Sequence, residues 1–382
     1  MNCTSEPSEK LPETTHSLYQ AFSQIPDPRS KRGIRYPLAV ILTVVTLGKL
    51  SGETELRGIA QWAQYRASSL WAAFGQPRAA MPHWTTYSRV LGQVDEHALQ
   101  AAIDSGLNRN PSGNQVIIDG KTLRGTIPTG KSRGEHLLAV YEPDTRTVLA
   151  QASVGAKANE IVVAPHLLAQ TALKGKLVTG DAMFTQRELS EQIIAAEGNY
   201  LWIVKENQPH LYQMIERLFC PEHPRPGHGS LATDFQTACQ VSKGHGRLER
   251  RTLTSSSLLQ AYADWPGLQQ VFRLERDRRP TCSPATCQVV YGITSLTSQQ
   301  ASASDLLTFT RRHWAIENQL HYVRDVSLRE DACRLTSRQA QRCLAMLNNL
   351  VLALLPATPF TFLPDAQRFF NAHLAHALAL LL

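Results

Sequence analysis

The sequence predicts an α/β protein in which a mixed sheet with flanking helices carries an inserted β element and follows a helical N-terminal domain. Apolar residues recur at helical spacing between about residues 14 and 108, where we find no convincing strand. From residue 115 the pattern changes to short apolar strands that alternate with helices, and more strands follow between 235 and 294. We therefore place a domain boundary near residue 110. It separates a helical unit at 1–110 from an α/β unit at 111–382 with a β-rich insertion at about 209–303.

The N-terminal region is predicted to be helical because its apolar segments are separated by Pro, Gly and charged turns. A basic stretch from Arg29 to Arg35 follows the first helix. The residues from His83 to Arg89 are typical of the short capped helices of helix-turn-helix modules, although ordinary packing in a helical bundle gives the same pattern. The predicted helices are Thr15–Ile25, Pro37–Ser51, Thr54–Arg66 and Thr85–Val94.

The second unit is predicted to start with three strands and to continue with alternating helices and strands, which implies a mixed sheet with covering helices. A segment rich in Pro, Gly and His at 221–229 interrupts this pattern before the inserted strands. The expected strands are Gln115–Asp119, His136–Tyr141, Thr147–Val154, Lys176–Gly180, Tyr200–Val204, Phe235–Ser242, Leu248–Thr254, Gln270–Arg276 and Gln288–Thr294. The expected helices are Glu160–Ala169, Thr185–Glu197 and, after the insertion, about Ser304–Val326, Thr336–Leu355 and Asp365–Leu381.

Three carboxylates lie in three different predicted elements: Asp119 and Asp181 each follow an apolar strand, and Glu317 lies on a helix. Acids at the ends of buried strands are held at one edge of a sheet, where a helix can bring a third acid to them. Hard divalent cations usually neutralise such a cluster, and two Mg²⁺ ions roughly 3.5–4 Å apart form the arrangement that cuts and joins phosphodiesters. A strand-end Asp is also a common turn former or helix cap, so that alternative stays open.

The helix that carries Glu317 has a polar seam. His313, His321 and Arg324 lie four or seven residues from Glu317 and would share its face on a regular helix. The pattern also fits a zinc or di-iron helix, but the two histidines are separated by roughly 12 Å along the axis, which is awkward for one ion. We expect Glu317 to complete the acid cluster, one or both histidines to contact phosphates or position water, and Arg324 to contact DNA, although either histidine alone also fits a structural role.

Basic and polar residues follow the predicted positions of the acids. Lys121 and Arg124 come just after the first Asp, and Lys205 and Gln208 come just after the strand that ends at Val204. All four converge on one sheet edge in the predicted fold, which favours contact with a phosphate backbone, although they would also balance the charge of the acids. A second acidic group, Asp325, Glu330 and Asp331, is better suited to helix capping and local ion pairs.

The chain is moderately basic, with 39 Lys and Arg against 32 Asp and Glu, a formal charge of +7 and a pI near 9.1. This balance suits a polyanionic partner without proving one. The excess is greatest in the insertion, where residues 240–280 contain eight basic and four acidic side chains. We therefore expect Arg247, Arg250 and Arg251 to contact DNA phosphates, which position DNA without reading its sequence.

The chain shows the composition of a cytoplasmic protein. It starts without a basic and then apolar leader, and its longest uninterrupted apolar runs are too short to cross a bilayer. Its seven cysteines are odd in number and scattered, without the short spacing of zinc knuckles. We expect free thiols in a reducing compartment and no membrane partner.

Six ordered segments resemble the ISAs-type DDE transposases, bacterial insertion-sequence enzymes that include the H-repeat-associated proteins. These segments are Val116–Gly125, Gly155–Ile161, Thr179–Gln186, Val204–Gln208, Gly244–Glu249 and His313–His321, the last followed by Asp325-Val326 and Glu330-Asp331. Residues 22–33 and the helices after them resemble the family's associated N-terminal region, so the resemblance covers nearly the whole chain. Where the wider transposase class carries Tyr and Arg before its catalytic Glu, this chain has Thr310 and His313, so those accessory roles do not carry over.

The resemblance implies a ribonuclease-H-like catalytic fold in which Asp119, Asp181 and Glu317 are the catalytic acids and hold two Mg²⁺ ions, which Mn²⁺ can replace. It implies double-stranded DNA as the partner, both the terminal inverted repeats of the element and target DNA, bound by a homo-oligomer at the bacterial nucleoid. The function expected is DNA cleavage and strand transfer. Two alternatives stay open: a catalytically idle relative that binds DNA, which the complete acid triad disfavours, and a nuclease that cuts without transfer.

Overall fold

The computed structural model describes residues 17–382 except 33, 77, 108–112, 128–129, 131–133, 156–158, 220–233, 245 and 281–283. The start of the first predicted helix and the segment at 221–229 therefore lie outside the described residues. Within the described part, the strands form a single nine-stranded sheet in the order β3-β2-β1-β4-β5-β9-β8-β7-β6.

The first five strands form the mixed sheet that the sequence predicts. β1 (Gln115–Leu123), β2 (Glu135–Glu142) and β3 (Thr147–Val154) are antiparallel, while β4 (Leu177–Gly180) and β5 (Asn199–Val204) continue the sheet parallel to β1. The parallel part requires crossover helices, which are α7 (Glu160–Ala169) and α8 (Arg187–Ala195). The order and directions of these strands agree with the ribonuclease-H-like fold expected from the resemblance.

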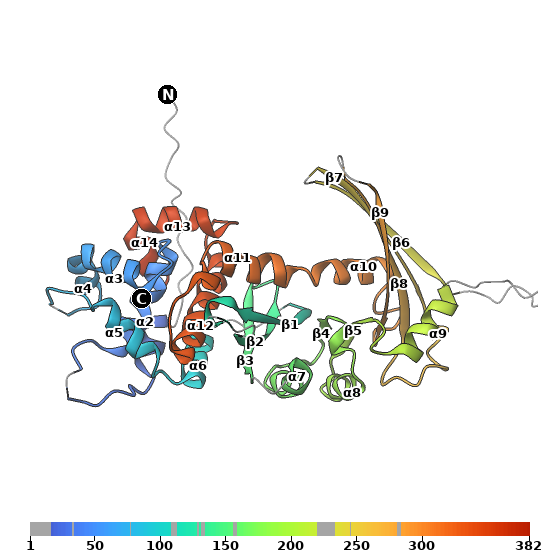
Figure 1. Ribbon diagram of the computed structural model, residues 1–382, viewed down its shortest axis with the longest axis horizontal. Coiled ribbons are helices and arrows are strands. Elements are labelled where there is room, and N and C mark those ends of the chain that lie inside the picture. The colour runs from blue at the N-terminus through green and yellow to red at the C-terminus, as the bar shows by residue number, and fades with distance from the viewer. Residues whose placement is uncertain are drawn as a thin grey trace, which may run out of the picture.

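The insertion extends this sheet. β6 (Gln236–Gly244), β7 (Arg247–Ser256), β8 (Gln270–Pro280) and β9 (Thr286–Thr294) are antiparallel neighbours, and β9 pairs directly with β5. Figure 1 shows these long strands rising well beyond the rest of the sheet. One helix was not predicted: α9 (Pro209–Phe219) begins the insertion and buries Leu211 and Ile215. These two residues are four apart, so they lie on one side of a helix but give little signal in a short segment.

The faces of the sheet are covered by different helices. Figure 1 shows α7 and α8 below the sheet and α10 (Ala303–Arg312) and α12 (Arg338–Leu354) on the other side. Successive strand residues point to opposite faces, so Ile117 joins one core with α12 while Val116 and Ile118 join another with α7 and α8. By length and composition, the helical segment Arg338–Ala357 could cross a membrane, but 78% of its apolar window is buried inside the protein, as in a core helix.

The N-terminal helices share a core with the end of the chain. They are α1 (Leu18–Ser23), α2 (Leu38–Leu50), α3 (Leu56–Tyr65), α4 (Ala67–Ala73), α5 (Trp84–Leu91) and α6 (Glu96–Leu107), of which α4 and α6 were not predicted. One apolar cluster joins them to α12, α13 (Leu363–Ala372) and α14 (Leu374–Ala379), and α2 is buried along its whole length. The division near residue 110 therefore stays a prediction, and the shared core argues against independent folding of the two parts.

Candidate active site

The pairing of β1 with β4 determines where the two aspartates lie. The parallel register ends with Ile118 opposite Gly180, and Asp119 and Asp181 are the residues that follow this last pair. The first strand was predicted to end at Asp119, but β1 continues to Leu123 because it stays paired with β2, where Asp119 lies opposite Ala139. Asp119 is thus rigidly held inside a strand, whereas Asp181 lies where its strand gives way to a loop and is largely exposed.

The predicted helix at 304–326 is not continuous. α10 ends at Arg312, a turn follows at residues 313–314, and a π-helical turn at Ile316–His321 leads into α11 (Tyr322–Val326). The backbone N–H of Tyr322 donates to the carbonyl of Glu317, five residues earlier, as in a π-helix. Such turns are rare and are often found at functional sites. Here the π-helical turn contains both Glu317 and His321.

Asp119, Glu317 and His321 form a cluster of two carboxylates and one imidazole at this sheet edge. The Nδ1 atom of His321 lies 3.5 Å from an Asp119 oxygen and 3.6 Å from a Glu317 oxygen. One ligand atom from each of the three side chains lies within 4.8 Å of the other two. The His321 side chain is only 6% exposed, while Glu317 is open to solvent on one side.

Asp181 is placed beside the other histidine. The Nε2 atom of His313 lies 3.9 Å from an Asp181 oxygen, and its Nδ1 atom lies 3.3 Å from the hydroxyl of Thr179. Burial lowers the pKa of His313, which favours the neutral ring. The three predicted acids are therefore gathered at one sheet edge, but Asp181 lies outside the tight cluster of the other two.

The cluster has an excess of negative charge that a divalent cation would offset. Burial, together with the nearby carboxylates of Glu317, Asp181 and Glu160, raises the pKa of Asp119 to about 7. Carboxylate oxygens and an imidazole nitrogen are both ligand atoms that coordinate divalent cations. The residues present therefore fit a divalent cation.

Glu160 was missed as a member of this site. Its carboxyl group lies over Gly120, where an added Cβ atom would meet it at 2.5 Å, so the glycine allows the close approach. One Glu160 oxygen lies 2.8 Å from His136, whose other ring nitrogen contacts the hydroxyl of Thr122 at 2.8 Å. The only signal in the sequence was that Glu160 lies within one of the six family-like segments.

Two known families match successive parts of this chain. A family described as "Transposase DDE domain" matches residues 110–354, and one described as "DDE_Tnp_1-associated" matches residues 19–105. The chain belongs to the DDE transposase family. Relatives include "Putative transposase YncI" of Escherichia coli O157:H7, 29% identical over 89% of this chain and 87% of its own length. Another is "H repeat-associated putative transposase YhhI" of Escherichia coli K12, 27% identical over 88% of this chain and 90% of its own length.

Among solved structures, the chain resembles a piggyBac transposase in a synaptic complex with hairpin DNA. The TM-score is 0.47 at 9% sequence identity, with 95% of this chain and 80% of that chain covered. The family match and the curated relatives confirm the resemblance to insertion-sequence transposases, H-repeat-associated proteins included.

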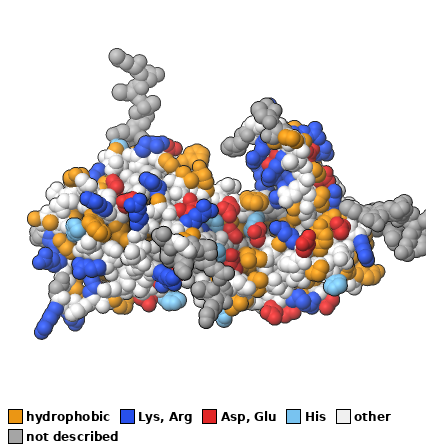
Figure 2. Space-filling view, viewed as in Figure 1, with side chains coloured by type: hydrophobic (Ala, Val, Ile, Leu, Met, Phe, Trp, Pro, Cys, Tyr) orange, Lys and Arg blue, Asp and Glu red, His pale blue; other side chains and the backbone are white. Residues whose placement is uncertain are grey.

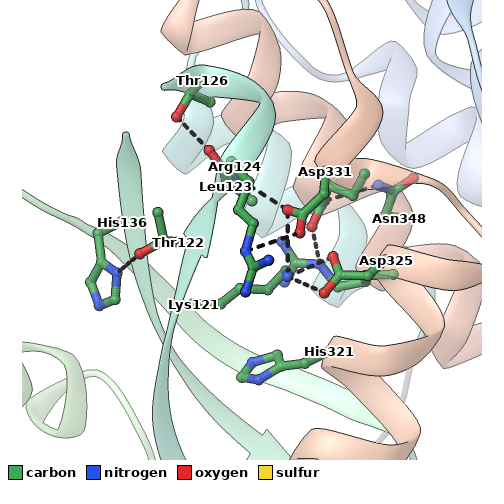
Figure 3. A network of polar contacts seen from close by, with 12 residues as sticks. Lys121, Thr122, Leu123, Arg124, Thr126, His136, His321, Asp325, Asp331 and Asn348 are labelled. Carbon is green, nitrogen blue, oxygen red and sulfur yellow. Dashed lines mark hydrogen bonds and ion pairs between the residues drawn. The ribbon is translucent and has the colours of Figure 1, made fainter. Parts of the chain in front are cut away.

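Lys121 forms a separate polar network with Asp325 and Asp331, beside the three candidate catalytic acids of this DDE-family chain. The Lys121 amino group lies 2.6 Å from the Asp325 carboxylate and 3.8 Å from Asp331, and the backbone N–H of Arg124 donates to Asp331. Figure 3 shows Lys121 reaching from β1 into this acidic group, with His321 pointing toward the same strand. Lys121 was predicted to contact a DNA phosphate. Instead it is buried and its ion pair with Asp325 attaches α11 to β1, so it is not free for a phosphate.

Arg324 is likewise held inside the protein. Its Nε atom donates to Glu330 at 2.7 Å, and Asn348 donates to the same carboxylate at 3.0 Å. Although burial alone would raise it, the Arg324 guanidinium and Asn348 hold the pKa of Glu330 below its usual value. Arg324 is 1% exposed, so the structure does not present it to DNA as predicted, because the π-helical turn and the Glu330 segment direct it inward.

The other predicted DNA contacts of this region have different surroundings. Lys205 is exposed and lines a pocket of about 590 Å³ together with Asp181. Arg124 is exposed as well. The side-chain amide of Gln208 donates to the carbonyl of Thr185 at 2.9 Å, which leaves its carbonyl oxygen for other partners. Lys205 and Arg124 therefore remain the better placed candidates.

A basic groove lies between the inserted strands and the helix that leads to Glu317. It encloses about 620 Å³ and includes Arg247, Arg251, Arg276, Arg278, Arg311, Trp314 and Asn318. Figure 2 shows Lys and Arg side chains over the raised strands, and Asp and Glu in the hollow beside them. The three arginines that were predicted to contact DNA do not lie on one face of β7. Arg247 and Arg251 line the groove, whereas Arg250 points to the opposite face, where it contacts Cys239.

Proposed function

We propose that this chain is the DNA transposase of a bacterial insertion sequence, which binds the element ends and catalyses metal-dependent cleavage and strand transfer. The observation that supports it best is the convergence of Asp119, Asp181 and Glu317 at one sheet edge, beside a basic groove of DNA-binding character. We propose Mg²⁺ as the cofactor, as two ions, with Mn²⁺ as a substitute.

Asp119, Asp181 and Glu317 would hold the divalent cations. Bound there, the cations would supply Lewis-acid polarisation of the phosphate and favour the deprotonated nucleophile, first water and then a DNA 3′-hydroxyl. The protein contributes rigidity, since Asp119 lies within a paired strand and the Lys121–Asp325 ion pair attaches the helix after Glu317 to that strand. His313 lies beside Asp181, where its ring can donate to a phosphate oxygen, or donate to or accept from a water.

The groove gives the DNA a place to lie. Five arginines and one glutamate line it, together with Lys243, so the net charge of its walls is strongly positive. Such a surface attracts the phosphate backbone whatever the base sequence. We propose double-stranded DNA as the partner, with the element ends and the target both bound by a homo-oligomer, in the bacterial cytoplasm.

The proposed function is tested with the purified chain and linear DNA that carries the inverted repeats found on either side of its coding region. With Mg²⁺ we expect nicking at the repeat boundary and joining of the new 3′ ends to a second DNA. Cutting without joining would identify a nuclease, and binding without cutting would identify an idle relative. Scrambled repeats are the matched control, because they keep the charge and remove the sequence.

The groove also predicts a difference between arginines on the two faces of β7. Replacing Arg247 and Arg251 with Gln should flatten the salt dependence of DNA binding by roughly one unit of log–log slope per lost phosphate contact. Replacing Arg250 with Gln removes one positive charge from the opposite face and should leave the slope nearly unchanged, whereas either groove arginine replaced alone should lower it. Equal slopes for both variants would show that the groove does not hold the DNA.

A further inference from the structure

His321 is placed where a DNA contact is not possible. Its side chain is 6% exposed and lies behind the two carboxylates, so a phosphate backbone cannot reach it without displacing them. The expectation that His321 touches phosphate is therefore not supported by its position. A polar ring that is buried this deeply needs another explanation.

An ion pair within the protein does not explain the position well. The Nδ1 atom lies 3.5 Å from Asp119 and 3.6 Å from Glu317, whereas charged N–H···O hydrogen bonds are about 2.7–2.9 Å long. The atom is therefore nearly equidistant from two carboxylate oxygens, within ion-pair distance of both but too far from either for a short charged hydrogen bond. On the far side of the ring, Nε2 has no hydrogen-bond partner among the described residues.

These separations suit three ligands around one ion. Neighbouring ligands at about 2.1 Å from an octahedral ion are roughly 3 Å apart, and opposite ones roughly 4 Å. The ligand atoms of Asp119, Glu317 and His321 all lie within 4.8 Å of one another, so small side-chain movements would bring them to such distances. Glu317 and His321 on the π-helical turn and Asp119 on β1 thus direct their ligand atoms toward the same position.

We propose that Nδ1 of His321 is a direct ligand of the divalent cation held by Asp119 and Glu317. The cation site is then a mixed carboxylate and imidazole site, unlike one made of acids alone. Mg²⁺ is a hard ion that prefers oxygen, so a nitrogen ligand shifts the preference of this position toward Mn²⁺. The inference rests on the proposed function, because it concerns the same cation.

Electron paramagnetic resonance of bound Mn²⁺ tests this directly, because a coordinated imidazole gives a ¹⁴N coupling that does not depend on DNA cleavage. We expect this coupling in the full-length protein and its loss in His321→Gln, together with Mn²⁺ binding weakened about 10-fold or more. Mg²⁺ binding should weaken less. His313→Gln is the matched control, because His313 lies eight residues earlier, in the turn after α10 and outside the three-ligand cluster, and it should keep the coupling.

The outcomes separate this inference from the proposed function. Bound Mn²⁺ without ¹⁴N coupling, or coupling that persists in His321→Gln, would overturn the role of His321 even if the protein still cuts and joins DNA. Coupling that disappears in His321→Gln would support it even if the element ends are never cut. Asp119→Asn should weaken the same Mn²⁺ signal, and a protein that binds no Mn²⁺ would overturn both proposals.

Discussion

Replacing Asp119 with Asn is expected to reduce cation-dependent DNA nicking by more than 100-fold while leaving DNA binding intact. Loss of an outer partner of a metal ligand typically costs about 10–100-fold, so removing the charge of a ligand held within a strand should cost more. The amide preserves the shape of the side chain. We expect Asp181→Asn and Glu317→Gln to have the same effect on nicking of DNA that carries the element ends.

Asp325→Asn is the matched control for these variants. Asp325 lies in the neighbouring network with Lys121 and outside the three-ligand cluster, so its amide should retain substantial nicking. If the amides at Asp325, Glu330 or Asp331 abolished nicking and Glu317→Gln did not, the assignment of the helical acid would be wrong. Normal nicking by any one of the three acid variants would remove that residue from the site.

The Asp119→Asn substitution should stabilise the metal-free protein at neutral and higher pH. The folded-state pKa of Asp119 is raised to about 7, above an unfolded value near 4, so the folded protein holds this proton more tightly than the unfolded chain does. The contribution of Asp119 to stability is therefore greatest at low pH and falls as the pH rises through 7. At about 1.4 kcal/mol per pKa unit, the loss is at most roughly 4 kcal/mol.

Unfolding by urea in the presence of a chelator measures this effect. The difference in free energy of unfolding between Asp119→Asn and the parent should be smallest at or below about pH 4, should increase in favour of the variant between about pH 4 and pH 7, and should level off by about pH 8. Added Mg²⁺ should stabilise the parent and not the variant, because only the parent retains the charged ligand. A variant that is less stable than the parent at pH 8 would show that the buried charge has another partner.

Much of the fold follows from local patterns in the sequence. The strands from Gln115 to Val204 and the four inserted strands were predicted because apolar, β-branched runs are bounded by turn residues. The helices α4 and α6 were missed because α4 follows α3 almost without a break and α6 is rich in Ala and polar residues. The direct pairing of β9 with β5 was not predictable, because no local pattern records which strands become neighbours.

The candidate site was predicted in part. The positions of Asp119 and Asp181 after apolar runs indicated a shared sheet edge, and the register of β1 and β4 places them there. The regular helix assumed around Glu317 was wrong, because the π-helical turn depends on tertiary packing that periodicity does not reveal. The burial of each side chain could not be predicted either. A basic residue near an acid can face DNA or form an internal ion pair, and the sequence does not tell which. The structure shows Arg247 lining the groove and Arg324 buried against Glu330.

Substitution of Arg324 is expected to have a large effect on stability. Arg324→Met should lower the free energy of unfolding by about 3–5 kcal/mol, because it leaves the Glu330 carboxylate buried without its cation. Arg324→Lys should lose less stability, since an ammonium keeps the charge but not the planar geometry. Replacing both partners with Met and Leu should be milder than Arg324→Met alone, because no unpaired charge remains inside the protein.

Urea unfolding of these variants, combined with the salt dependence of their DNA binding, decides between the two interpretations of Arg324. The structure predicts a large loss of stability and an unchanged salt slope for whatever fraction remains folded, because the guanidinium is 1% exposed. A phosphate contact predicts the opposite result, namely normal stability and a slope lower by about one unit. Full stability in Arg324→Met would therefore return Arg324 to the DNA surface and would mean that the segment containing Glu330 is not held as the structure places it.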